Sequence, residues 1–82
     1  MSGDDSPVTP LKRRLAERIA ARVRTLGLNQ TQAADEVEIT QPRMNALLND
    51  RVELFSLDAL VEIAARLGLT VRISVARPYQ RK

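Results

Sequence analysis

Apolar side chains recur every three or four residues along most of this chain, and that spacing predicts four helices. The first has Thr9 as its N-cap, Pro10 in its first turn and Gly27 as the left-handed residue that ends it. The fourth has Ser56 as its N-cap and ends at Gly68. Their apolar faces are Leu11, Leu15, Ile19, Val23 and Leu26 in the first helix, and Leu57, Leu60, Val61, Ala64 and Leu67 in the fourth.

Two shorter helices are predicted between these. Asn29 caps the second, and Gln32, three residues later, completes the sequence pattern of a capping box. Thr40 caps the third, and Pro42 falls in its first turn, where the backbone N–H has no partner to lose. The inner faces are Ala33, Ala34 and Val37 in the second helix, and Met44, Leu47 and Leu48 in the third. Gln41, Arg43, Asn45 and Asn49 are left on the outer face of the third.

Apolar and polar residues alternate over residues 70–77, and this period of two predicts a strand that Pro78 ends. A lone strand leaves its backbone N–H and C=O groups unpaired, so it either pairs with a strand of another molecule or stays exposed to water. We favour pairing with a second copy. Ile63 widens the apolar face of the fourth helix, either as an edge of the core or as part of a second surface. The predicted dimer contacts are Ile63, Leu67, Leu69, Val71, Ile73 and Val75.

The predicted fold is therefore all-α, with one domain over residues 9–76. It is a bundle of four or five helices with one C-terminal β-strand. Residues 1–8 are predicted to be a disordered lead-in without the apolar stretch of a secretory signal, and residues 77–82 form a basic tail.

The composition excludes most catalytic chemistry. The chain has no Cys and no His, so thiolate nucleophiles, the common catalytic triads and most transition-metal sites are excluded. We therefore expect no enzyme, no metal and no cofactor. No apolar run approaches the roughly 18 residues of a membrane span. These features favour a cytoplasmic protein that binds a partner.

The charge is uneven along the chain. Residues 1–27 carry six basic and three acidic residues. Residues 28–68 carry three basic and seven acidic residues. Residues 69–82 carry four basic residues and no acidic residue. A basic terminal segment is typical of nucleic-acid binding, although it is also typical of a solvated tail. Arg14, Arg18 and Arg22 form a stripe on the first helix, either for phosphate or for solvent.

The second and third helices form a helix-turn-helix, joined by a three-residue turn. Asn and Gln side chains can bond adenine through two hydrogen bonds, and Arg can bond guanine in the same way. Helix N-termini also attract phosphate. These arguments predict Asn29, Gln30, Thr40, Gln41, Arg43, Asn45 and Asn49 as DNA-binding residues.

Two stretches carry a resemblance to a known family. Residues 26–34 (LGLNQTQAA) and 37–48 (VEITQPRMNALL) resemble the XRE or Cro/repressor family, whose fold is lambda-repressor-like. Residues 55–69 (FSLDALVEIAARLGL), followed by VRISV, are similar to its HigA-type antitoxin branch. Residues 11–75 are covered by the resemblance.

The resemblance implies a homodimer that binds double-stranded DNA at an inverted-repeat operator and represses transcription, often of its own operon. It implies that Gln41, Pro42, Arg43 and Asn45 lie against base edges. It also implies that Gln30, Asn49 and the start of the second helix lie near phosphates. The antitoxin branch implies a RelE-like or HigB-like toxin as a partner. The alternatives are a stand-alone phage-type repressor, and a module whose main role is to neutralise a toxin.

Two positions depart from the family pattern. Glu38 occupies a turn position that is often Gly, and a left-handed backbone there would cost roughly 1 kcal/mol. Pro42 replaces a polar residue at the start of the third helix, which leaves a small apolar group that could contact a thymine methyl.

Overall fold

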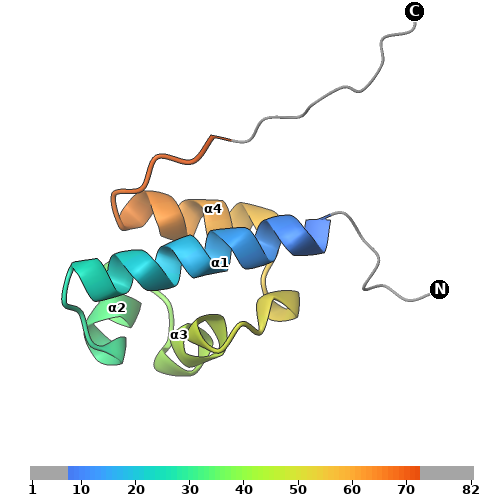
Figure 1. The fold of residues 1–82 in the computed structure, drawn as a ribbon. Helices are drawn as coiled ribbons and strands as arrows, with labels where there is room; N and C mark the ends of the chain where they lie inside the picture. The colour runs from blue at the N-terminus through green and yellow to red at the C-terminus, as the bar shows by residue number, and fades with distance from the viewer. Residues whose placement is uncertain (1–7, 73–82) are drawn as a thin grey trace, which may run out of the picture.

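The computed structural model describes residues 8–72. They form α1 (Val8–Thr25), α2 (Gln30–Val37), α3 (Gln41–Leu48), the short 3-10 helix η2 (Val52–Leu54) and α4 (Leu57–Arg66). Helices α1 and α4 lie side by side, and α2 and α3 pack beneath them (Figure 1). Over this range there is no strand, so the helical part of the predicted fold is confirmed.

The core lies between these helices and is almost wholly aliphatic. Ile19, Met44, Leu47 and Leu60 are its largest fully buried side chains, one or two from each of α1, α3 and α4. Ala33 and Ala34 of α2 are buried against them, and their small size allows a close approach of the helices. Phe55 is the one aromatic residue among the buried side chains that the structure describes. All four α-helices contribute side chains to this one core, and their packing fixes the positions of α2 and α3 and the direction that the outer faces of these two helices point.

Three of the four predicted caps at helix starts are confirmed. Asn29 Oδ1 accepts from the N–H of Gln32 at 2.8 Å, and Gln32 Oε1 accepts from the N–H of Asn29 at 2.9 Å, which completes the capping box. Thr40 Oγ1 accepts from the N–H of Arg43 at 3.2 Å at the start of α3. Ser56 Oγ accepts from the N–H of Ala59 at 3.0 Å at the start of α4. Each cap satisfies an N–H that has no partner inside its helix.

The start of α1 differs from the prediction. Val8 is already helical, so Thr9 is not the N-cap and Val8 is not part of a disordered lead-in. Pro10 still lies in the first turn, where it breaks no helical hydrogen bond. Leu11 and Leu26 of the predicted apolar face are 42% and 43% exposed. Because α1 has 18 residues and α4 only 10, α4 cannot cover both ends of that face.

Arg22 has a different role from the one its place in the basic stripe suggests. Its Nε donates to the carbonyl oxygen of Leu67 at 2.8 Å, so it caps the C-terminus of α4. A cation at a helix C-terminus is favourable because the last carbonyls carry partial negative charge. Gly68 follows with a φ of 84° and ends the helix in the predicted way.

The predicted dimer contacts fall into three groups. Ile63 and Leu67 belong to the core of the single chain, with exposed fractions of 4% and 3%. Leu69 and Val71 pack partly against that core, and residues 69–72 have no regular secondary structure. Ile73, Val75 and the rest of the predicted strand lie outside the described residues, as do residues 1–7 and the basic tail. No helix in the described range is long and apolar enough to cross a membrane.

Candidate nucleic-acid interface

The turn between α2 and α3 depends on Glu38. Its φ and ψ are 61° and 45°, the left-handed conformation that ends α2 and reverses the chain. The N–H of Ile39 then donates to the carbonyl oxygen of Ala34 at 3.0 Å, which closes the turn. The Glu38 carboxylate lies 3.2 Å from a guanidinium nitrogen of Arg66 on α4. The left-handed backbone considered from the sequence is therefore present, and it places the start of α3 beside the start of α2.

Gln30 connects the two helices directly. Its Oε1 accepts from Asn45 Nδ2 at 3.2 Å, and its Nε2 donates to the carbonyl oxygen of Gln41 at 3.4 Å. One side chain at the start of α2 thus contacts the first and fifth residues of α3. These bonds are exposed, so their net contribution to stability is small. Their effect is to hold the amide of Asn45 in one orientation on the protein surface.

The predicted amide residues of α3 share one flank of that helix. A helix turns by about 100° per residue, so residues four apart lie nearly in line. Gln41, Asn45 and Asn49 have this spacing, and all three are exposed. Asn49 Nδ2 donates to the carbonyl oxygen of Asn45 at 2.7 Å and caps the end of α3. Pro42 is exposed beside this row. The structure thus gathers four of the eight predicted residues on one side of α3.

Arg43 lies apart from the amide row. Its guanidinium carbon is 4.4 Å from the centre of the Phe55 ring, a cation–π contact. Arg43 is two residues from Asn45 in the chain, which places the two side chains on opposite flanks of α3. Residue spacing placed Arg43 on the outer face but did not indicate Phe55 as its partner. The sequence feature that could have indicated this contact is Phe55 itself, an isolated aromatic residue directly before the Ser56 cap.

The first turns of α2 and α3 supply the remaining predicted residues. Asn29 and Thr40 are exposed caps, and each lies next to backbone N–H groups that have no partner four residues earlier. Such N–H groups favour a phosphate oxygen. The side chains of α2 and α3 include only one cation, Arg43. The interface is therefore rich in amides and poor in charge.

Charged pairs flank the end of α3. Arg13 of α1 lies 3.5 Å from the carboxylate of Asp50, and Arg51 Nε donates to Glu53 at 2.9 Å. The hydrogen bond from Arg51 lowers the pKa of the Glu53 carboxyl. No cluster of acidic side chains that could hold a metal ion occurs between residues 8 and 72.

Comparison with known proteins gives one result. A family model described as a helix-turn-helix domain matches residues 2–76, which is most of the chain. No curated protein and no solved structure matches this chain.

Proposed function

This chain belongs to the helix-turn-helix domain family, and from that membership we propose that it is a sequence-specific DNA-binding regulator. In the proposed complex α3 lies in the major groove and the start of α2 lies against the phosphate backbone. The observation that carries the proposal is the link from Gln30 to Asn45 and to the backbone of Gln41. It fixes amide groups on α3 relative to the helix start that would bind phosphate.

The amides of Gln41 and Asn45 are the proposed contacts to base edges, where an amide can bond adenine through two hydrogen bonds. Pro42 is the proposed apolar contact to a thymine methyl. Contacts to phosphate come from Asn29, Gln30, Thr40 and Asn49. Phosphate contacts fix the position of a protein on the duplex, whereas base contacts determine which DNA sequence it prefers. The phosphate-contacting and base-contacting residues therefore have separate effects on binding.

Arg43 is proposed to leave Phe55 and bond guanine. An exposed cation–π contact contributes roughly 0.5–1 kcal/mol. A two-hydrogen-bond contact between Arg and guanine discriminates by about 1–3 kcal/mol. The guanine contact is therefore the stronger one, and Phe55 holds the guanidinium only in the free protein.

We propose that the protein acts as a homodimer through residues 69–75 and represses its own gene. A two-fold dimer places two copies of α3 on half-sites roughly 34 Å apart, so the operator is an inverted repeat. The segment 55–75 also resembles HigA-type antitoxins, which supports a RelE-like or HigB-like toxin partner. A gene for such a ribonuclease beside this one would favour an antitoxin, and its absence would favour a stand-alone repressor.

The test is a fluorescence anisotropy titration with the DNA upstream of the gene, against scrambled DNA, at two salt concentrations. We expect tight binding to the upstream DNA only, and a salt slope that counts the phosphate contacts. Arg43→Ala should weaken binding to the operator by about 1–3 kcal/mol and relax the preference at one base pair.

Arg24→Ala is the matched control, because Arg24 is an exposed arginine of α1 and is not among the proposed DNA-binding residues. It should leave sequence preference unchanged. An equal loss on all DNA sequences in the Arg43 variant would contradict base contact by Arg43. Weak binding of the native chain to both DNAs would contradict the proposed autoregulation.

A further inference from the structure

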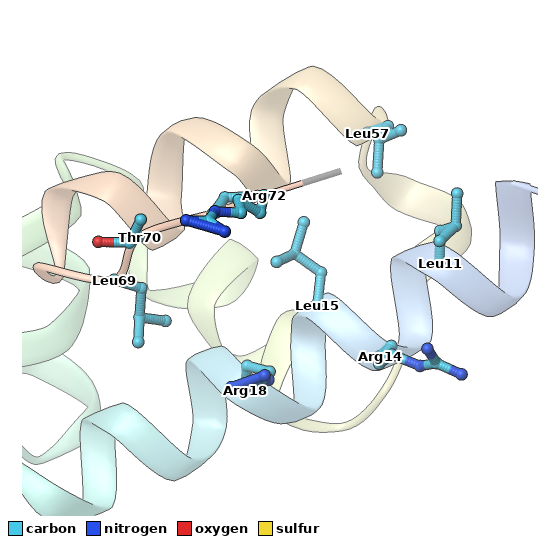
Figure 2. A pocket seen from close by; sticks show the side chains of 9 residues that line it. Leu11, Arg14, Leu15, Arg18, Leu57, Leu69, Thr70 and Arg72 are labelled. Atoms are coloured by element: carbon cyan, nitrogen blue, oxygen red, sulfur yellow. The ribbon is translucent and has the colours of Figure 1, made fainter. Parts of the chain in front are cut away.

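A groove lies between α1, α4 and the segment that follows α4. It has a volume of about 280 Å³, close to the lower end for pockets that hold small ligands. In Figure 2, Leu15 points from α1 toward this space, between Leu69 on one side and Leu11 and Leu57 on the other. The proposed DNA-binding residues of α2 and α3 are not among its lining residues, so the groove is a separate feature of the molecule.

The floor of the groove is apolar. Its apolar lining residues are Leu11, Leu15, Leu57, Leu69 and Val71. Leu11 is 42% exposed, although a Leu side chain is usually buried in a domain of this kind. A ligand that covers these apolar side chains would remove their surface from water, which is favourable by roughly 25 cal/mol per Å² of apolar surface buried.

Three arginines line the same groove: Arg14, Arg18 and Arg72. No carboxylate is among the lining residues, and within residues 8–72 none of the three arginines forms an ion pair or a side-chain hydrogen bond. Arg18 comes from α1 and Arg72 from the segment after α4, while the guanidinium of Arg14 points away from the other two (Figure 2). Arg18 and Arg72 therefore offer unpaired positive charge at the edge of an apolar surface.

We propose that this groove binds a small amphipathic carboxylate. Its apolar body lies on Leu15, Leu57 and Leu69, and its carboxylate lies between Arg18 and Arg72. Arg recognises carboxylates through charge-assisted hydrogen bonds in a planar fork, which suits this arrangement. The site does not depend on DNA binding, although Leu69, Val71 and Arg72 also belong to the segment 69–75 proposed to pair in the dimer.

Charge also decides against one alternative occupant, the basic tail of a second copy. Residues 77–82 contain three basic residues and no acidic residue. Such a segment would add positive charge to a groove that already holds three unpaired arginines. An occupant with a carboxylate removes this repulsion, whereas a basic one increases it.

The experiment is a titration of the ¹⁵N-labelled full chain with sodium octanoate, followed by amide chemical shifts. We expect shifts at Leu15, Arg18, Leu57 and residues 69–72, with 1-octanol binding at least about fivefold more weakly because it lacks the charge. Arg18→Gln and Arg72→Gln should each weaken octanoate binding by a similar factor. Arg24→Gln, an exposed arginine outside the groove, should bind octanoate as the native chain does.

A second pair of variants tests the apolar contact. Leu11→Ala should weaken octanoate binding about threefold, since it removes methylene and methyl groups from the groove edge. Leu26→Ala is the matched control, with nearly the same exposure at 43% and no place in the groove.

Several outcomes would overturn the proposal. Octanol that binds as well as octanoate would mean that the arginines do not recognise the carboxylate. Equal loss in the Arg24 variant would mean a general charge effect. Shifts at Leu11, Leu15 and Leu57, which lie outside the proposed dimer segment 69–75, would mean that a second copy covers the groove if they depend on protein concentration without octanoate. None of these outcomes depends on DNA, so failure here is distinct from failure of the proposed regulator.

Discussion

Two non-glycine residues of the described chain, Glu38 and Asp50, have positive φ angles of 61° and 63°. Two glycines, Gly27 and Gly68, have φ angles of 71° and 84° at the ends of α1 and α4. A side chain in this conformation costs roughly 1 kcal/mol. At Glu38 an exposed ion pair with Arg66 offsets part of that cost, since such pairs contribute about 0–1 kcal/mol. Glycine at the other two positions avoids the cost.

The two glycines differ in their surroundings, which gives a matched comparison. A Cβ on Gly68 would lie 3.1 Å from Arg22 Nη2, while a Cβ on Gly27 would have nothing within 4 Å. We expect Gly27→Ala to lower the free energy of unfolding by about 1 kcal/mol, and Gly68→Ala by about 2 kcal/mol, because its Cβ also crowds the guanidinium that bonds Leu67. Urea denaturation followed by circular dichroism measures both. Equal losses would mean that a Cβ at position 68 does not disturb the bond from Arg22 to Leu67.

Single residues show what sequence could and could not predict. Gly27, Gly68 and the left-handed turn at Glu38 were predictable because their signals are local. The role of Arg22 was not, since its partner Leu67 lies 45 residues away in the chain. The position of Arg43 over Phe55 was not predicted either, because Phe55 lies in a different part of the chain. Long polar side chains can reach many partners, and only the packed structure shows which of these partners lie close enough to bond.

At the scale of elements, α2 and α3 are only eight residues each. Isolated helices shorter than about 12–15 residues are marginal in water, so these two depend on their caps and on packing. Asn29 and Thr40 supply the caps, and both could be predicted because a cap and its partner lie three residues apart. The starts of α2, α3 and α4 were therefore well predicted, whereas Thr9, which is also a capping residue type, did not mark the start of α1.

Asn29→Ala should lower the free energy of unfolding by about 1–2 kcal/mol, because it removes the cap and leaves the N–H of Gln32 without its partner. Thermal unfolding at matched concentrations measures the loss. Thr31→Ala is the control, since Thr31 is exposed in the same turn and Ala favours a helix. A similar loss in both variants would show that the capping box is not what holds α2.

At the scale of the whole molecule, the described chain has a closed core. Ile63 and Leu67, which the apolar stripe of α4 suggested for a dimer surface, are buried within one chain. The stripe could not decide this, because core and interface residues follow the same spacing. The dimer proposed above relies on residues 69–75, and the strand in that segment remains a prediction.

Ile73→Pro should weaken dimerisation about tenfold or more, because proline removes a ladder hydrogen bond from a paired strand. Analytical ultracentrifugation over a concentration series measures the change. Ile73→Thr is the control, since threonine keeps the backbone N–H and favours strands. An unchanged dimer in the proline variant would exclude pairing through this segment.

The contact between Arg43 and Phe55 gives the molecule a spectroscopic consequence. The only other aromatic residue in the sequence is Tyr79, and the Arg43 guanidinium lies 4.4 Å above the Phe55 ring. The ring current of an aromatic shields protons above its face, so the side-chain protons of Arg43 resonate upfield while the stack persists. When the guanidinium leaves for a base, that shielding disappears. The chemical shifts of the Arg43 side chain therefore report whether the residue proposed to contact guanine is stacked on Phe55 or released from it.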